Sequence, residues 1–187
     1  MDLGEICEVI IGVTPSRIDS ELLLKHKFTS RIFEYVFNCE TENSLPFETQ
    51  PLFEQRFDLT LSTKGDLIVD LTSLRTIVVN KEVENFIVYQ KYAIIKCRGI
   101  VNPYFLSWYI NEKLYKKKKS FLQRSSVANI PISEIRTLKI DLPTKEVQYK
   151  IGNLYKLLLE KKKIEKRKIE LENILILSSL NSMFEKE

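Results

Sequence analysis

One stretch near the end of this sequence constrains the fold more than any other. From Lys145 to about Phe184 there is no proline, and the only glycine is Gly152. Helices of globular proteins usually run for about 8–20 residues, whereas this stretch has 40. Pro143 and Thr144 end the part of the sequence that comes before it. We therefore predict one continuous C-terminal helix that is far longer than a usual globular helix.

The apolar side chains of this predicted helix form a narrow stripe. They recur at alternating three- and four-residue spacing or at sevenfold spacing, around a polar middle of sequence EKKKIEKRKIE, which is typical of coiled coils. A long helix with a narrow stripe cannot bury that stripe alone, and the sequence offers no second helix of that length. We therefore expect the partner to be another chain. The predicted interface residues, which follow Val147 in the stripe, are Ile151, Leu154, Leu158, Ile164, Leu171 and Leu175.

The residues before this helix are rich in β-branched and apolar runs separated by turns. A turn at 64–66 precedes several such runs, and 103–115 has an apolar stripe at helical spacing with a proline in its first turn. Residues 21–60 show no clean period. We predict an α+β fold, with a mixed α/β domain over 1–143 and a coiled-coil helix over 144–187. The predicted strands are 3–12, 67–71, 76–79, 86–89, 92–97 and 138–142.

Charge is distributed unevenly along the 187 residues. Residues 1–60 carry 5 Lys/Arg and 11 Asp/Glu, a net of −6, whereas residues 61–143 carry 14 and 7, a net of +7. Residues 144–187 carry 10 and 7, a net of +3, so the whole chain has a net charge of +4. A basic middle behind an acidic start indicates one face suited to a polyanion. The alternative is that the charges lie wherever solvent reaches them.

Composition excludes several classes of protein. The three cysteines are far apart without a CxxC pair, and His26 is the only further soft ligand, so we expect no structural zinc site. An odd cysteine count without a secretory signal fits a reducing cytoplasm. No apolar run approaches the roughly 20 residues of a membrane span. No Gly-rich loop follows a predicted strand, so we expect no cofactor. The expectation is a soluble cytoplasmic protein.

Several short motifs occur in a fixed order along nearly the whole chain. They are LGEI at 3–6, GVTPSR at 12–17, KGDLI at 64–68 and NPYFL at 102–106. The most specific is the junction of IPI at 130–132, LKIDLP at 138–143, Gln148 and Ile151. In this order the motifs resemble the specificity (S) subunit of type I restriction-modification systems. The junction is similar to that family's passage from a target recognition domain into its conserved spacer helix.

The resemblance implies a function of DNA recognition, with the chemistry performed by partners. It implies that the chain directs a DNA adenine methyltransferase (modification) subunit and a restriction subunit to a bipartite target in double-stranded DNA. The family's usual subunit carries two recognition domains and two spacer helices, whereas this sequence shows one of each. The resemblance therefore implies a half-subunit that forms a homodimer through its C-terminal helix.

The DNA-binding residues that we predict form three groups, each with a purely structural alternative. The first is a basic segment after the helix at 103–115, where lysines could instead be a solvated helix end. The second is a polar turn after the first strand, which could simply cap an element. The third consists of two arginines at strand ends, which could be merely solvated. The residues are Lys116, Lys117, Lys118, Lys119, Gln123, Arg124 and Ser125; Thr14, Ser16 and Arg17; and Arg75 and Arg98. The basic residues of the long helix, at 161–163 and 166–168, are expected to be a solvated face, with DNA contact as the alternative.

Two other classes of function remain as alternatives. One is a stand-alone DNA-modifying enzyme fragment, because Asn102 opens an Asn-Pro-Tyr-Phe motif similar to that of amino-methyltransferases. In the same class, Asp141 with Gln148 and Lys150 is loosely similar to a nuclease metal site. Against an enzyme, the second proline of the methyltransferase motif is absent. The other alternative is a protein that binds partners through its helix and never contacts DNA.

Overall fold

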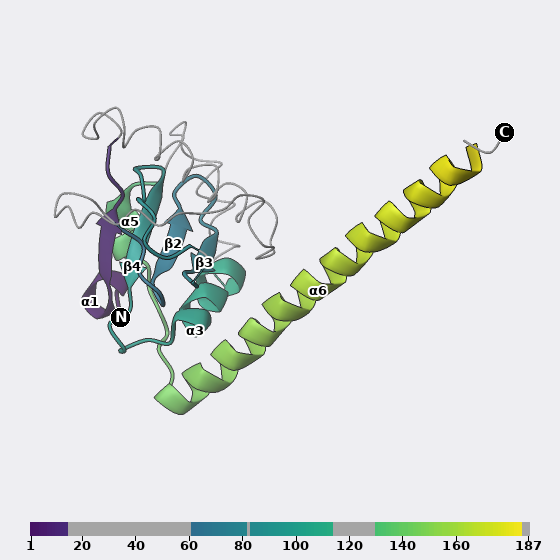
Figure 1. Ribbon diagram of the computed structural model, residues 1–187. Helices are drawn as coiled ribbons and strands as arrows, with labels where there is room; N and C mark the ends of the chain where they lie inside the picture. The colour runs from purple at the N-terminus through teal and green to yellow at the C-terminus, as the bar shows by residue number, and fades with distance from the viewer. Residues whose placement is uncertain (15–60, 82, 114–129, 185–187) are drawn as a thin grey trace.

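The computed structural model describes residues 1–14, 61–81, 83–113 and 130–184. In these ranges the chain forms a four-stranded antiparallel sheet, short helices against it, and one very long helix (Figure 1). The α+β class predicted from sequence is confirmed. The strands are β1 (Glu8–Ile11), β2 (Leu67–Asp70), β3 (Thr76–Val78) and β4 (Tyr92–Lys96). The helices are α1 (Leu3–Ile6), α3 (Pro103–Trp108), which continues as the π-helical turn η2 (Tyr109–Lys113), α5 (Ile132–Arg136) and α6 (Lys145–Phe184).

The sheet has the strand order β1-β4-β2-β3, and every neighbouring pair is antiparallel. Its two central strands are buried on both faces, which explains why β2 and β4 read as continuous apolar runs rather than as alternating ones. Along β4, Ala93 and Ile95 point to one face and Tyr92 and Ile94 to the other.

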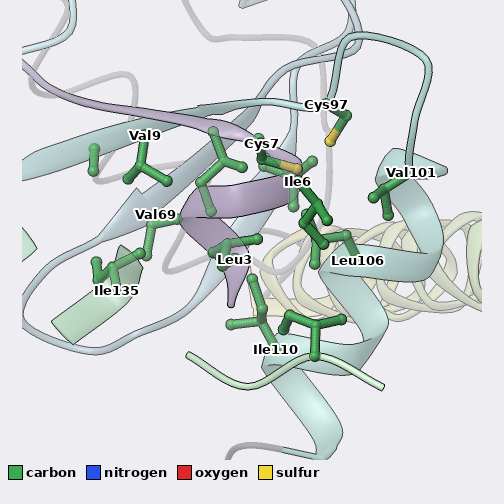
Figure 2. Packing of buried hydrophobic residues seen from close by; sticks show 14 of the residues in the cluster. Leu3, Ile6, Cys7, Val9, Val69, Cys97, Val101, Leu106, Ile110 and Ile135 are labelled. Atoms are coloured by element: carbon green, nitrogen blue, oxygen red, sulfur yellow. The ribbon is translucent and has the colours of Figure 1, made fainter. Parts of the chain in front are cut away.

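The larger core lies on the face that the short helices cover. Side chains of α1, α3 and α5, including Leu3, Leu106 and Ile135, pack there against β1, β2 and β4 (Figure 2). A smaller cluster on the opposite face joins Ile68 and Ile94 to the segment 79–88. The sheet is therefore enclosed from both sides.

Helix α6 begins against the domain and then extends far beyond it (Figure 1). Its first turns pack on α3, and its buried residues, Gln148, Gly152 and Tyr155, all lie within those turns. At about 1.5 Å per residue, the helix is about 60 Å long. The long helix predicted from sequence is confirmed over Lys145–Phe184.

Three of the predicted strands differ in the structure. Residues 3–6 form α1, where the Asp2 N–H donates to Glu5 Oε2 at 2.9 Å and so favours a helical turn over a strand. With the other described residues, 86–89 make isolated bridges, from Ile87 to Leu61 and from Tyr89 to Val13. Residues 138–142 likewise make a single bridge, between Lys139 and Asp2.

In the part of the chain that the structure describes, no helix has the length and apolar character needed to cross a lipid bilayer.

Candidate functional site

Most of the predicted DNA-binding residues lie outside the described residues. These are Ser16, Arg17, Lys116, Lys117, Lys118, Lys119, Gln123, Arg124 and Ser125. The structure places the remaining three, Thr14, Arg75 and Arg98.

The strand register places these three residues at two opposite ends of the sheet. Thr14 follows the end of β1, and Arg75 lies in the turn between β2 and β3. Because Ile11 pairs with Ala93, and Asp70 with Tyr92, both residues lie at the end where β4 begins. Arg98 follows the end of β4 and therefore lies at the other end. The two arginines do not form one basic site.

Arg98 stands in a tight turn at the exit of β4. Its backbone has φ 45° and that of Gly99 has φ 73°, both in the left-handed region, where a glycine avoids the Cβ clash. The Arg98 guanidinium is ion-paired with Glu8 at the start of β1, and 68% of its side chain remains exposed. An exposed ion pair of this kind is weak, so the guanidinium can exchange Glu8 for another anion.

A cleft of about 470 Å³ opens beside Arg98, between the sheet and the start of α6. Four basic residues line it, together with the carboxyl group of Asp66 and the ring of Tyr149. The basic residues are Lys64, Lys96, Arg98 and Lys145. Lysine and arginine side chains around a concave surface attract anions, phosphates among them.

Asp66 is the acidic residue of this cleft, and it is largely buried. Burial raises the pKa of its carboxyl group above the ordinary 3.8, while the Thr63 N–H and the Lys96 ammonium oppose the rise. The Thr63 N–H donates to Asp66 Oδ2 at 3.2 Å, which closes the turn before β2. The carboxyl group therefore serves the turn rather than a ligand.

At the opposite end of the sheet, a buried polar network joins β3, α3, η2 and α6. Thr76 Oγ1 lies 2.9 Å from Ser107 Oγ, and the Thr76 N–H donates to Asn111 Oδ1 at 2.8 Å. Asn111 Nδ2 donates to the Thr76 carbonyl and to the Tyr155 hydroxyl, each at 3.0 Å. Burial raises the pKa of Tyr155, and the Asn111 hydrogen bond and the Arg75 charge oppose this rise. The charge of Arg75 therefore acts beside the long helix.

A second set of contacts holds the first turns of α6 against α3. The Asn102 N–H donates to Gln148 Oε1 at 3.1 Å, and Gln148 Nε2 donates to the Pro143 carbonyl at 2.9 Å. The Asn102 side chain caps α3 by accepting the Phe105 N–H at 3.0 Å. A Cβ on Gly152 would lie only 2.4 Å from Asn102 Oδ1, so only glycine permits this approach. We call these contacts the helix junction.

The residues that suggested an enzyme all make structural contacts within the domain and the start of α6. Asn102 and Gln148 are engaged in the helix junction, and Lys150 pairs with Glu146 at 2.7 Å. Asp141 Oδ2 accepts the Tyr109 hydroxyl at 3.1 Å. Within residues 1–14, 61–81, 83–113 and 130–184, no three His, Cys, Asp or Glu side chains gather as a metal site would require.

The predicted interface residues of α6 fall into two groups. Ile151 is half-buried and packs against the core of its own chain, so it belongs to the intramolecular contact. The other five, Leu154, Leu158, Ile164, Leu171 and Leu175, are between 44% and 69% exposed. The exposed apolar surface of α6 is wider than the narrow stripe that the sequence pattern predicted. The further exposed apolar residues are Leu157, Ile169, Ile174, Ile176, Leu177, Leu180, Met183 and Phe184.

Sequence reasoning missed the polar network and most of the helix junction. Gln148 was noticed as part of the resembling motif and of a possible nuclease site, and its spacing from Asn102 gave no sign of a hydrogen bond. The one available signal was Gly152, because a glycine inside a long helical pattern usually has a packing reason.

Comparison with solved structures supports the resemblance at the level of the fold. No protein-family model matches the chain, and no curated protein matches it. A chain from a structural study of complex assembly and conformational transition of the type I R-M system aligns with TM-score 0.57 and 18% identity over 96% of this chain. The crystal structure of the HsdS subunit from Thermoanaerobacter tengcongensis aligns with TM-score 0.51 and 16% identity over 89%. The chain spans 42% and 38% of the length of these two chains.

Proposed function

We propose that this chain is a DNA sequence-recognition (specificity) subunit of a type I restriction-modification complex. It performs no chemistry itself and directs a DNA adenine methyltransferase subunit and a restriction subunit to a bipartite target. Two copies pair through α6, so that two recognition domains read the two halves of the target. The boundary between recognition domain and helix, at residues 143 and 144, is part of the same proposal.

The observation that carries this proposal is the arrangement of the whole chain. A mixed domain followed by one long projecting helix is shared with the HsdS crystal structure over 89% of this chain. A fold alone does not define a function, but here the order of the resembling motifs and the fold agree. The buried helix junction also fixes the direction in which α6 leaves the domain, as a spacer between two recognition domains requires.

The basic cleft and the predicted loop residues supply the DNA contacts in this proposal. Phosphate contacts position a protein on DNA, while side chains that reach base edges supply the specificity. Arg98, Lys64 and Lys145 suit the first task, because they are exposed, and Lys96 is partly exposed beside them. The predicted residues outside the described ranges, Lys116–Lys119 with Gln123, Arg124 and Ser125, and Ser16 with Arg17, remain candidates for either task, as do Thr14 and Arg75.

The exposed apolar side chains of α6 support pairing with a second copy. Ile164 is 69% exposed, Leu175 is 67% exposed and Phe184 is 83% exposed. A helix with apolar side chains on so much of its surface is ordinarily buried by neighbours. A second α6 offers a surface of matching chemistry, because a twofold pair buries the same residues on both chains.

Methylation mapping in cells tests the function directly. Cells that carry this chain with its methyltransferase subunit should show adenine methylation at one bipartite sequence whose halves are inverted repeats. A clearly asymmetric target would contradict the homodimer and indicate a second recognition chain. Methylation without sequence restriction, or none that depends on this chain, would contradict the specificity role itself.

DNA retention separates this proposal from a protein that works only through its helix. The wild-type chain should bind double-stranded DNA with an affinity that falls as salt rises, because phosphate contacts release counterions. A variant with alanine at 116–119 should bind more weakly and with a smaller salt dependence. Negligible binding by both proteins, even with the methyltransferase subunit present, would favour the helix-only alternative.

Light scattering tests the pairing. The purified chain should have twice the mass of one chain, and Leu175→Glu should shift it toward the monomer by placing a charge in the interface. Asn153→Glu adds the same charge to an exposed position near the start of α6 and serves as the control. A monomeric wild-type chain at micromolar concentration would contradict the homodimer.

A further inference from the structure

Two buried cysteines, Cys7 and Cys97, face each other at one end of the sheet. In the β1–β4 ladder Glu8 lies opposite Lys96. Cys7 directly precedes β1 and Cys97 directly follows β4, so the two cysteines continue the ladder and lie opposite each other. The backbone of Cys7 is extended, with φ −135° and ψ 149°, and so continues the direction of β1. Figure 2 shows the two sulfur atoms turned toward one another. Both residues are only 5% exposed.

The hydrogen-bond pattern of the ladder places this pair at a favourable position. The Gly12 N–H donates to the Tyr92 carbonyl, so Gly12 and Tyr92 form a hydrogen-bonded pair. Because such pairs alternate with non-hydrogen-bonded ones in an antiparallel ladder, the Glu8–Lys96 pair is also hydrogen-bonded. Cys7 and Cys97 therefore occupy a non-hydrogen-bonded pair, and the Cys7 N–H instead donates to Leu3 O at 2.9 Å. Such pairs have Cα atoms about 4.5 Å apart, and disulfides need about 4.4–6.8 Å. The usual Cα spacing of such a pair thus falls within the range that a disulfide needs.

The two thiols differ in their readiness to react. A hydrogen bond from the Cys97 thiol lowers the pKa of Cys7, while the same contact and burial raise the pKa of Cys97. Cys7 is therefore the sulfur that more easily becomes a thiolate, the form that attacks an oxidant. Cys97 lines the basic cleft beside Arg98, so the cysteine pair lies next to a surface cleft on its Cys97 side.

We propose that Cys7 and Cys97 form a redox modification site that a hydroperoxide converts into a disulfide. The Cys7 thiolate attacks one peroxide oxygen, the O–O bond breaks, and Cys7 becomes a sulfenic acid as hydroxide leaves. The Cys97 sulfur then attacks the Cys7 sulfur, the S–O bond breaks, and the hydroxyl group leaves as water with the Cys97 proton. With hydrogen peroxide, the two thiols lose two electrons in total and the peroxide yields two waters.

The disulfide would join the N-terminal segment covalently to β4. It would close a loop of about 90 residues in the chain, and long loops gain most from closure. For a chain of this size we expect the melting temperature to rise by roughly 4–16 °C. Cytosolic disulfides are typically transient and redox-sensing, so a thiol reductant should reverse the change. This inference does not depend on the proposed DNA recognition.

Peptide mapping after peroxide treatment tests the proposal. The third cysteine, Cys39, lies outside the described residues. A Cys39→Ser chain is therefore used, so that Cys7 and Cys97 are the two remaining cysteines. This chain is treated with hydrogen peroxide, its free thiols are blocked with N-ethylmaleimide, and it is digested without reductant. We expect a linked Cys7–Cys97 peptide within single chains, the loss of two thiols, and a higher melting temperature that dithiothreitol restores to its starting value.

A second variant tests the order of the two steps. Cys97→Ser in the same background should stop at a sulfenic acid on Cys7, which dimedone traps, with no rise in melting temperature. If this variant does not fold, mapping of the parent chain still decides the proposal. Recovery of both cysteines as blocked thiols, as separate sulfinic acids or in links between chains would overturn it.

Discussion

Replacing Gly152 with alanine tests the helix junction on which the direction of α6 depends. The added Cβ would lie 2.4 Å from Asn102 Oδ1 and 3.2 Å from the Phe105 nitrogen. Losing the Asn102 cap costs about 0.5–2 kcal/mol, and overpacking costs about 1–3 kcal/mol. Alanine in place of glycine returns about 1 kcal/mol of helix propensity. We therefore expect a net loss of about 2 kcal/mol of unfolding free energy.

Chemical denaturation followed by circular dichroism measures this loss, and thermal melting should show a decrease of about 4–8 °C. Asn153→Ala is the matched control, because Asn153 is exposed on the next position of α6. It should leave the unfolding free energy unchanged or raise it by about 0.5 kcal/mol through helix propensity alone.

A double-mutant cycle identifies the cause of the loss. If the Asn102 side chain is the obstacle, Gly152→Ala should cost much less in an Asn102→Ala background than in the wild type. A Gly152→Ala chain as stable as the wild type would refute the close approach of α6 and α3. A loss of equal size in both backgrounds would refute the role of the Asn102 cap.

Three further expectations concern the interior. Tyr155→Phe removes the 3.0 Å hydrogen bond from Asn111 and should lower the unfolding free energy by about 1 kcal/mol in urea titrations. The raised pKa of Tyr155 means that its contribution is complete below the unfolded value, about 10.0, and is lost as pH rises through the folded value. Wild-type stability should therefore fall more steeply above pH 10 than that of Tyr155→Phe, and parallel curves would contradict this. Phe105 is 1% exposed, so Phe105→Ala should cost about 3–5 kcal/mol by the same titration, and a loss below 1 kcal/mol would contradict its place in the core.

Local patterns predicted the parts of the fold that depend on neighbours along the chain. The absence of helix breakers predicted the start of α6 and its continuous run to Phe184, and continuous β-branched runs predicted β2 and β4. The errors arose where distant contacts decide the structure. Residues 138–142 have a strand-like pattern, but among the described residues they bridge only to Asp2. A sequence pattern does not show whether a segment will find a neighbouring strand.

The candidate site was less predictable than the fold for the same reason. Arg75 and Arg98 have similar sequence contexts, yet the strand order β1-β4-β2-β3 separates them to opposite ends of the sheet. The polar network depends on contacts between residues as distant as Thr76 and Asn111, or Asn111 and Tyr155. Such pairings follow from how the elements pack, which one chain's spacing does not reveal.

The way α6 is held has a mechanical consequence. Its buried residues end at Tyr155, so the remaining part, about 45 Å long, acts as a lever arm fixed at one end. A tilt of about 10° at the junction would displace the far end by about 8 Å, more than one helical turn. The few hydrogen bonds around Asn102, Gln148 and Tyr155 therefore set how accurately the far end of α6 is positioned. Small changes at these contacts are amplified at its tip.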